Sequence, residues 1–340
     1  MAGSLLRLPA IKQHKRERIG LEETACGIPP ELSEARFTLR DVSGIGRDPV
    51  TVYQDPSNII RIGDRYYVWY TRYPHDESWM TTWRTNNCTR IWLATSADGV
   101  SWSEHGQVVE DSDQAAWHGE GKHAPAVASH DGKYYLYFCA HTGKPINEKH
   151  IGVALADSPE GPFKHVAGGP VLSPTLDGYS FDAHLIDDPC VIVRDGRFWM
   201  YYKGRTSMRS PCMIGLAVAE NPTGPFVRWS GSPLLCGHTG CVWPHREGVA
   251  LIADEKPPDR AVYYSPDGYR FEKAADIVAH ISDPGVFSAD AFDNTSYGSG
   301  VAWGLSQLYD ENKQLTNQLG RPQFSSYVVR WDCDMRAPAA

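Results

Sequence analysis

Short apolar runs alternate with turn residues along this chain, and one stretch shows the pattern clearly. Two acidic residues, Asp187 and Asp188, precede Pro189 and an apolar run at 190–193, and an Asp-Gly pair then leads into an aromatic run at 198–202. An Asp-Gly pair between two such runs is a strong signal for a β-hairpin. The pattern therefore predicts a hairpin that carries carboxylates at the start of its first strand.

The same order of elements recurs, which is the main indication of the fold. Aromatic runs, which we expect to form the second strand of each unit, lie at 66–70, 134–138 and 198–202. Runs of small alternating residues, which we expect to form the third strands, lie at 91–97, 151–156 and 214–219. A fourth unit follows at 242–271 and a weaker fifth at 298–331. Repetition of this kind indicates stacked sheets. The sequence therefore predicts an all-β protein, a five-bladed β-propeller.

Residues 1–48 precede the repeats and form, in our interpretation, an N-terminal arm. Helix-forming residues follow Pro30, which the first turn of a helix tolerates, so the arm is expected to be partly helical. Scattered leucines and isoleucines give it apolar anchors, which favours docking on its own body or on a partner chain. We expect two parts: the arm, a candidate for exchange within a dimer, and a catalytic propeller domain at 49–340.

The composition agrees with strands and turns and narrows the range of partners. Aromatic residues make up 11% of the chain, which also has 31 Gly and 24 Pro, a mixture that favours strands and tight turns over helices. The formal charge is -8 and the basic residues form no long run, which argues against a nucleic acid or an anionic membrane as partner. A neutral or polar small ligand fits better.

Cysteine usage and the N-terminal residues bear on the compartment. None of the 8 Cys residues forms a Cys-x-x-Cys pair and several lie in apolar runs, so we expect buried thiols. The first residues lack an apolar core of signal-peptide length, and no apolar run approaches the roughly eighteen residues of a membrane span. These observations predict a cytoplasmic protein.

The first strand of each blade should line the central channel of a propeller, so the residues at its entrance should converge. The five entrances are Asp55-Pro56, Ala124-Pro125, Asp188-Pro189, Trp243-Pro244 and Ser299-Gly300. Two carboxylates at such a mouth suit cleavage of a glycosidic bond, in which one acid protonates the leaving oxygen and another carboxylate activates water or attacks directly. Asp55 and Asp188 are the leading catalytic pair, although an Asp-Pro step also serves to cap a turn. With several acids close together, at least one pKa should be raised by like charges.

Other polar residues near these entrances are candidates for the same site. His238 lies just before the fourth channel strand, and a histidine can act as an acid near neutral pH. Asp182 and Asp187 flank Asp188 and could hydrogen-bond either a sugar or neighbouring backbone. Glu247 lies in the presumed turn after the fourth channel strand and is expected at the far rim.

An insertion in the first unit offers a platform for a sugar ring. Trp79 and Trp83, with Arg84, could pack on the apolar face of a sugar, or could contact the N-terminal arm. The remaining candidate substrate-binding residues are His123, Thr239 and Trp243.

No cofactor is predicted, although scattered His and Asp residues could bind a divalent cation in the channel. Tight spacing such as His-x-x-x-His, which is typical of metal sites, does not occur near the entrances. A cation is therefore compatible with the pattern but is not predicted by it.

Four segments carry a resemblance to a known family over nearly the whole chain. They are Gln54-Asp55-Pro56-Ser57, the segment 180–190 with its Asp187-Asp188-Pro189-Cys190, the segment 237–244 with Gly237-His238 and Val242-Trp243-Pro244, and Leu32-Ser33-Glu34-Ala35 in the arm. Together they resemble glycoside hydrolase family 117. The resemblance implies a five-bladed propeller, a helical arm exchanged between the subunits of a homodimer, and inverting exo-hydrolysis of terminal 3,6-anhydro-L-galactose from neoagaro-oligosaccharides. It also implies that Asp55 is the general base, Asp188 the second active-site acid and His238 the general acid.

Two positions depart from the family pattern and point to a divergent member. Thr239 stands where the family has a glutamate directly after the histidine, and Asp187 stands where the family tends to have a histidine. The first change removes a carboxylate beside the acid, and the second adds one beside Asp188. We therefore expect hydrolysis of an oligosaccharide that ends in 3,6-anhydro-L-galactose or a related sugar.

The sequence leaves other functions open. A family 43-like arabinofuranosidase or xylosidase would use Glu247 as its acid, whereas a non-catalytic sugar-binding propeller would bind sugar without turnover. A propeller that only binds other proteins would not need clustered carboxylates, so the acids at the entrances argue against that function.

Overall fold

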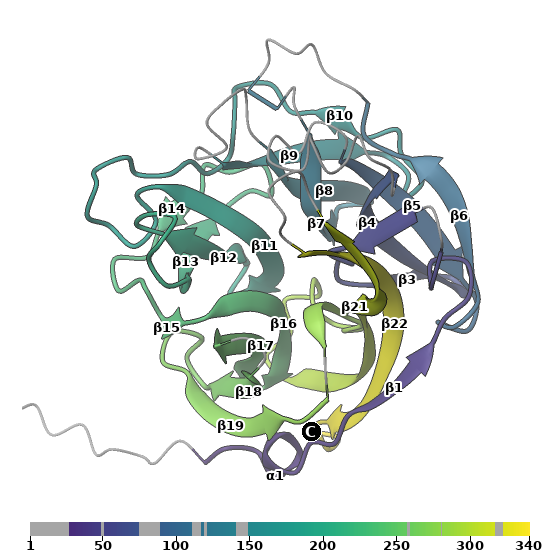
Figure 1. Cartoon of the computed structure of the whole chain (residues 1–340). Coiled ribbons are helices and arrows are strands. Elements are labelled where there is room, and N and C mark those ends of the chain that lie inside the picture. The colour runs from purple at the N-terminus through teal and green to yellow at the C-terminus, as the bar shows by residue number, and fades with distance from the viewer. Residues whose placement is uncertain are drawn as a thin grey trace, which may run out of the picture.

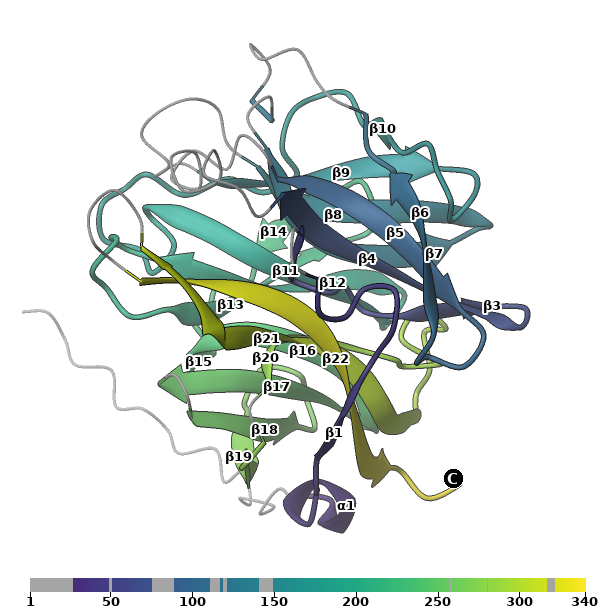
Figure 2. The same ribbon diagram turned by 45° about the vertical axis from the view of Figure 1, so that its right-hand side comes forward.

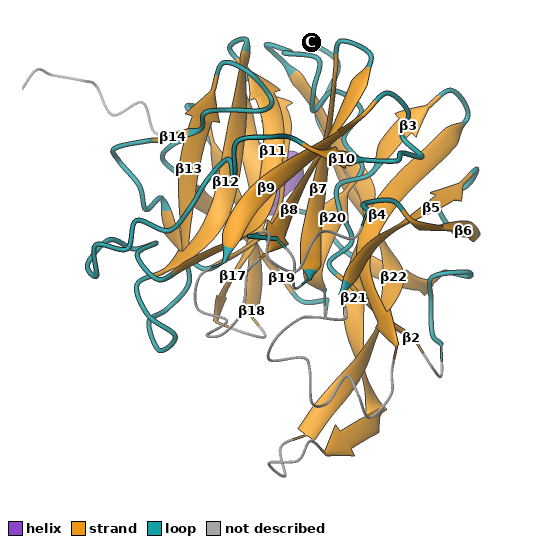
Figure 3. Ribbon diagram, turned by 90° about the horizontal axis from the view of Figure 1, so that it is seen from above, coloured by secondary structure: helices purple, strands orange, loops and turns teal. Residues whose placement is uncertain are grey.

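A computed structural model shows an all-β protein, as expected, with one short helix in its described part (Figure 1; Figure 3). The structure describes residues 27–48, 51–74, 89–110, 117–118, 121–140, 149–256, 259–279, 281–316 and 322–340. No helix in that part of the chain is long and apolar enough to cross a membrane.

The first half of the described chain forms two antiparallel sheets. The first has the order β2 (Thr51–Gln54), β4 (Arg65–Pro74), β5 (Arg90–Ser96) and β6 (Trp102–Gln107), and β3 (Ile60–Ile62) also pairs with β4. The second has the order β7 (Lys122–His130), β8 (Lys133–Ala140), β9 (His150–Ala156) and β10 (Lys164–His165).

Two further sheets follow. The third has the order β11 (Leu185–Arg194), β12 (Arg197–Arg205), β13 (Met213–Ala219) and β14 (Val227–Arg228), with β15 (Leu235–Cys236) on β13. The fourth has the order β1 (Thr38–Asp41), β22 (Pro322–Arg336), β21 (Gly298–Thr316), β16 (His238–Arg246), β17 (Gly248–Lys256), β18 (Asp259–Ser265) and β19 (Glu272–Ile277), with β20 (Ser282–Val286) on β21.

The hairpin predicted from the acidic and aromatic runs is confirmed. β11 and β12 pair antiparallel, with Val193 opposite Phe198 and the turn formed by Asp195 and Gly196. These two turn residues have φ angles of 53° and 68°. Positive φ at both central positions gives the turn the twist that an antiparallel pair requires, and aspartate and glycine tolerate it well.

The strand groups lie around a common centre (Figure 1; Figure 2). Buried hydrophobic side chains of the described residues form five clusters; four join neighbouring sheets, and the one that contains Trp243 lies within the fourth sheet. One member of each cluster, in order around the centre, is Trp69, Met200, Trp199, Trp243 and Trp303. The last cluster joins β21 and β22 to the first sheet, so hydrophobic packing continues around the molecule.

The division into five separate blades stays a prediction. Two of the expected units belong to one eight-stranded sheet, because β16 pairs with β21 where His245 lies opposite Ser299 and Arg246 opposite Gly298. The structure therefore shows an all-β arrangement around a centre, in which the fourth and fifth predicted units belong to one sheet.

The described part of the expected arm docks on the body of the same chain. The helix α1 (Pro30–Ser33) begins at a proline, as expected, but is only 4 residues long. Leu32 is fully buried among hydrophobic residues of the fourth sheet. Glu31 accepts hydrogen bonds from Arg246 through both carboxylate oxygens, at 2.8 and 2.7 Å, and lies 2.9 Å from Nε2 of His245. The boundary at residue 48 and exchange between subunits stay predictions.

Candidate active site

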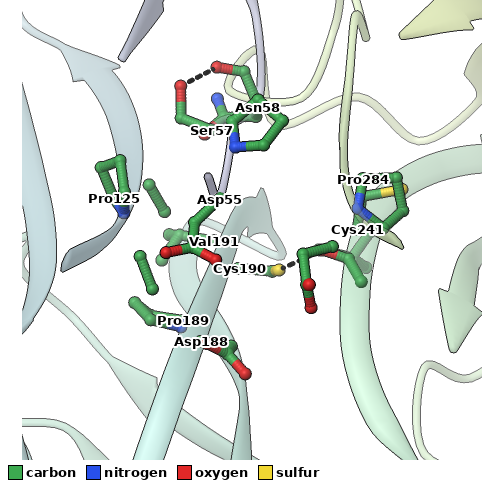
Figure 4. A pocket seen from close by; sticks show the side chains of 16 residues that line it. Asp55, Ser57, Asn58, Pro125, Asp188, Pro189, Cys190, Val191, Cys241 and Pro284 are labelled. Carbon is green, nitrogen blue, oxygen red and sulfur yellow. Dashed lines mark hydrogen bonds between the residues drawn. The ribbon is translucent and has the colours of Figure 1, made fainter. Parts of the chain in front are cut away.

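A pocket lies where the inner strands of the sheets meet, and Figure 4 shows Asp55 and Asp188 on its wall. It holds about 480 Å³ of empty space, open solvent included. Its lining residues lie at 55–58, 124–126, 188–191, 240–242 and 283–284. Residues from the second, third and fourth sheets and from the segment between β2 and β3 therefore contribute to one site.

The pocket wall is built by the same irregularity in several strands. The pairing register shifts between Asp187 and Cys190 in β11, and equivalent shifts occur in β7 and β20. Each shift leaves an X-Pro pair out of the ladder, which fits the missing N–H of proline. The residue before each proline has a positive φ: 49° at Asp188, 47° at Ala124 and 42° at Asp283. Asp55, which precedes Pro56, has 49°, so the aspartates share one backbone conformation.

Asp283 was not among the residues that the sequence predicted, and the fifth entrance is corrected accordingly. Ser299 lies opposite His245 in the β16–β21 pair and does not line the pocket. Asp283 and Pro284 on β20 line it instead. The signal was present as another Asp-Pro pair, but it lies before the segment in which the repeat was sought.

Asp55 is held at the pocket by two hydrogen bonds. Thr71 Oγ1 accepts from the backbone N–H of Ala124 at 3.0 Å and donates to Oδ2 of Asp55 at 2.9 Å. The backbone N–H of Asp55 donates to Oε1 of Gln307 at 2.9 Å. Burial, followed by the nearby charges of Asp283 and Asp188, raises the pKa of Asp55 to about 8. The raised pKa expected for a carboxylate cluster thus occurs at Asp55, with burial as its largest cause.

Asp188 pairs with a lysine that the sequence analysis missed. Nζ of Lys203, on β12, lies 2.5 Å from Oδ2 of Asp188 and 3.5 Å from Oδ2 of Asp187. Although burial opposes it, the two carboxylates hold the pKa of Lys203 well above its usual range. The side chain of Lys203 is thus a buried ammonium group on the wall behind Asp188.

His238 lies between two acidic residues of the site. Its Nε2 is 3.0 Å from Oδ2 of Asp188 and 2.7 Å from Nζ of Lys203, and its Nδ1 is 3.2 Å from Oδ1 of Asp283. Its backbone N–H donates to Oδ1 of Asp254 at 2.9 Å. The three predicted catalytic residues therefore come together: Asp55 and Asp188 line the pocket, and His238 contacts Asp188.

Asp187 lies behind Asp188 and contacts cations. It is 4% exposed, with Oδ2 2.5 Å from Nζ of Lys149 and Oδ1 3.3 Å from Nε2 of His123. Against the effect of burial, Lys149 and Lys203 hold the pKa of Asp187 well below its usual range. Burial lowers the pKa of His123. Asp187 and His123, both predicted to bind substrate, contact other protein side chains beneath the pocket and do not line it.

One group of described residues has the donor atoms of a metal site. One ligand atom each of His123, Cys139 and Asp187 lies within 4.8 Å of the others. The ammonium groups of Lys149 and Lys203 already neutralise Asp187 from 2.5 and 3.5 Å. A cation would have to displace these like charges, so the residues present do not fit a metal well.

Two further predicted substrate-binding residues are structural, which corrects the sequence analysis. Asp182 is 1% exposed and accepts hydrogen bonds from Tyr202 Oη at 2.9 Å and Arg228 Nε at 2.6 Å. Trp243 is fully buried in a hydrophobic cluster of the fourth sheet. Neither side chain lines the pocket. On β16, which carries Trp243, the pocket wall is formed by Gly240, Cys241 and Val242 instead.

The remaining candidates lie outside the described side chains or away from the pocket. Trp79, Trp83 and Arg84 lie outside the described residues. Thr239 pairs with Ala253 through its backbone, and its side chain is not described. Glu247 is exposed in the turn between β16 and β17, at the other end of β16 from His238. It therefore cannot serve as the acid of this pocket, which corrects the family 43-like alternative.

Comparisons with known proteins relate the chain to two families of glycoside hydrolases. The sequence profile of Glycosyl hydrolases family 43 matches residues 47–189, a segment that contains Asp55 and Asp188. The arabinoxylan arabinofuranohydrolase of Bacillus subtilis is 28% identical over 193 residues, which cover 53% of this chain and 33% of that protein. Xylosidase/arabinosidase 43A of Humicola insolens is 40% identical over 103 residues, which cover 30% of this chain and 27% of that protein. The chain thus spans a third or less of these curated relatives.

A solved structure is similar over most of the chain. Zg3597, a family 117 glycoside hydrolase of Zobellia galactanivorans, superimposes with a TM-score of 0.78 at 27% identity, covering 90% of this chain and 92% of that one. These matches point to a glycosidase. Within that class the chain is a divergent, family 117-like protein, which confirms the resemblance found in the sequence.

Proposed function

We propose that this protein is an exo-acting, inverting glycoside hydrolase that removes a terminal sugar, 3,6-anhydro-L-galactose or a related sugar, from oligosaccharides. The observation that carries the proposal is that Asp55 and Asp188, from different parts of the chain, line one pocket and that His238, on β16, lies 3.0 Å from Asp188. Acid–base hydrolysis requires one group that takes a proton from water and one that gives a proton to the leaving oxygen. Asp55 and His238 are the candidates for these two roles, and Asp188 contacts His238.

Asp55 acts in this proposal as the general base. It takes a proton from water while the water oxygen attacks the anomeric carbon and the bond to the leaving oxygen breaks. The hydrogen bond from Thr71 at 2.9 Å fixes its carboxylate. His238 gives a proton to the leaving oxygen, and Asp188 with Lys203 fixes the ring from the Nε2 side.

The charges around the pocket support a neutral substrate. Asp55, Asp188 and Asp283 line it, whereas Lys203 and Lys149 are each within 2.5 Å of an aspartate oxygen. An anionic sugar would meet carboxylates whose repulsion is not offset by a lysine that faces the pocket. A neutral terminal sugar therefore fits the site better.

The similarity to family 43 motivates a second substrate class at the same site. The matched segment 47–189 includes Asp55 and Asp188 but ends before His238. Two curated relatives are named for arabinose- or xylose-releasing activities. An arabinofuranosidase or xylosidase function would use these same residues, because Glu247 lies in a distant exposed turn.

Two proposals about assembly accompany the activity. A closed propeller of five blades is supported by the five hydrophobic clusters, four of which join neighbouring sheets while one lies within the eight-stranded fourth sheet. A homodimer formed through the arm is supported by the family 117 resemblance. Light scattering of the full chain and of a chain without residues 1–40 tests the dimer, because the truncated protein should have the lower mass.

Hydrolysis is tested by assaying the wild type and Asp55→Asn against neoagarobiose, other neutral algal and plant oligosaccharides, and aryl arabinofuranosides and xylosides. We expect sugar release by the wild type and a loss of about 10²–10⁴-fold in Asp55→Asn. Asp48→Asn is the matched control, because Asp48 also precedes a proline but does not line the pocket. NMR of freshly released sugar reports whether the anomeric configuration is inverted.

Each outcome of this assay decides a different part of the proposal. No release by the wild type from any member of the panel would overturn hydrolysis. Release that is equal in the wild type and Asp55→Asn would remove Asp55 from the chemistry. The substrate that is released fastest names the sugar class.

A further inference from the structure

Asp283 is a third pocket aspartate with no role in the proposed function so far. It lies on β20, precedes Pro284 and has the same positive φ as Asp55 and Asp188. These three aspartates all line the pocket. Because Asp283 repeats the backbone geometry of two candidate catalytic residues, its carboxylate is placed in the same site.

The two oxygens of Asp283 have different neighbours. Oδ1 lies 3.2 Å from Nδ1 of His238. Oδ2 accepts hydrogen bonds from Nε2 of Gln307 at 2.6 Å and from Oγ of Ser282 at 3.0 Å. Two donors on Oδ2 fix the direction in which Oδ1 faces the imidazole ring.

Gln307 connects this carboxylate to the candidate base. Its side chain is 2% exposed, and its Oε1 accepts from the backbone N–H of Asp55 at 2.9 Å. That contact fixes which end of the amide carries oxygen, so the NH₂ end is the one that donates to Asp283. One buried amide therefore sets the positions of Asp55 and Asp283 relative to each other.

The contacts of the two ring nitrogens of His238 differ. Nε2 lies 2.7 Å from the ammonium group of Lys203, which is a donor, and 3.0 Å from Oδ2 of Asp188, which is an acceptor. Nδ1 lies 3.2 Å from Oδ1 of Asp283, an acceptor that favours a proton on this nitrogen. The charged groups that face the ring are Asp188, Lys203 and Asp283, with Asp254 on the backbone N–H and Arg260 beside Asp254.

We propose that Asp283 is the positioning residue of His238 and that Gln307 couples it to Asp55. The inference rests on the proposed function, in which His238 protonates the leaving oxygen. Asp283 accepts the hydrogen bond from Nδ1 throughout, so that His238, protonated from solvent between turnovers, presents its second ring proton on Nε2 to the leaving oxygen. The leaving oxygen takes that proton and the electron pair of the broken bond, Asp55 takes the proton of the attacking water, and Asp283 exchanges none.

The experiment compares Asp283→Asn and Asp283→Glu with the wild type on two substrates of the same sugar. One carries the natural sugar leaving group, which needs a proton, and the other an activated dinitrophenyl group, which leaves without one. We expect Asp283→Asn to lose about 10- to 100-fold in kcat on the natural substrate and much less on the activated one. Asp283→Glu, which keeps the carboxylate, should recover part of the loss.

The pH profile gives a readout that a merely structural role would not change. The alkaline limb of kcat/KM should move to lower pH in Asp283→Asn, because the imidazolium has lost a neighbouring carboxylate. Asp276→Asn, an exposed aspartate on β19, is the matched control and should leave both substrates and the limb unchanged. Equal loss on both substrates with an unmoved limb would overturn the proposal.

NMR of ¹⁵N-histidine-labelled protein tests the same contact without catalysis. Signals of His238, assigned by their loss in His238→Asn, should report a proton on Nδ1 in the wild type and a changed tautomer population in Asp283→Asn. If the wild type hydrolyses no substrate, the proposed function fails while this measurement still decides the contact. An unchanged His238 spectrum in folded Asp283→Asn would overturn it.

Discussion

The ammonium nitrogen of Lys203 lies 2.5 Å from an oxygen of Asp188, and both groups are largely shielded from water. Lys203 also lies 3.5 Å from Asp187 and 2.7 Å from Nε2 of His238. One buried cation thus compensates two carboxylates and fixes the histidine ring. The charge balance of the site depends on it.

Removal of this cation should destabilise the fold and abolish activity. In Lys203→Met the two carboxylates of Asp187 and Asp188 lose a buried partner, and breaking such a pair costs about 3–5 kcal/mol. Urea unfolding measures the change in the free energy of unfolding. Lys133→Met, at an exposed pair with Asp157, is the control and should change it by less than about 1 kcal/mol. A similar small change in Lys203→Met would contradict the buried compensation.

The pH at which activity rises should be unusually high for an enzyme whose general base is a carboxylate. A base works when ionised, and burial with the charges of Asp283 and Asp188 raises the pKa of Asp55 to about 8. The acid limb of kcat/KM should therefore lie well above the ordinary carboxylate range, with activity lost as pH falls through it. A profile that is flat from pH 5 to pH 9 would contradict this prediction.

The same raised pKa predicts how Asp55 affects stability. A carboxyl whose pKa is higher in the folded state binds its proton more tightly there, so its contribution is present at low pH and is lost as pH rises through about 8. Asp55→Asn cannot ionise and should raise Tm more at pH 9 than at pH 5. Scanning calorimetry at both pH values measures the difference, and equal shifts would argue against a pKa raised by the fold.

The docking of α1 should depend on Glu31. Although burial opposes it, hydrogen bonds from Arg246 and His245 lower the pKa of Glu31, so this contact stabilises docking above the ordinary glutamate pKa and weakens as pH falls. Glu31→Ala should speed tryptic cleavage at the exposed Arg36 several-fold. Glu34→Ala, at an exposed neighbour, should leave the rate unchanged. An unaltered rate in Glu31→Ala would show that Leu32 alone holds the helix.

Trp243 should behave as a core residue. It is fully buried, so Trp243→Ala should destabilise the fold by about 3–5 kcal/mol. Trp243→Phe should cost less and leave KM unchanged, because the side chain does not line the pocket. A rise in KM without a loss of stability would restore the sugar contact that the sequence suggested.

The sequence predicted those site residues whose signals are local. Asp55 and Asp188 each precede a proline at the corresponding place of a repeated unit, which predicts that they meet at one centre. Asp283 has the same signal, but its strand begins before the weak fifth unit, so the search for a repeat passed over it. Lys149 and Lys203 have no local signal, because only the folded sheets bring them to Asp187 and Asp188.

Burial explains the residues that the sequence assigned wrongly. Asp182 and Trp243 lie close in sequence to catalytic candidates. The hydrogen-bond partners of Asp182, Tyr202 and Arg228, come from other strands, as do the hydrophobic residues around Trp243. The alternation of polar and apolar residues along one strand does not show which side chains of other strands will contact it. The all-β class, in contrast, follows from turn chemistry and aromatic runs that act within each hairpin.

The pairing of β1 with β22 ties the order of synthesis to the completion of the fold. Residues of β1 leave the ribosome early but meet their partners, with Thr38 opposite Asp332 and Asp41 opposite Val329, only when β22 has been made. Until then β1 has no strand to pair with, and the helix α1 lacks part of the fourth sheet on which it packs. In the nascent chain the pairing of β1 with β22 therefore stays incomplete until the end of synthesis. Loss of either strand, by truncation or cleavage, would remove the same pairing from the finished fold.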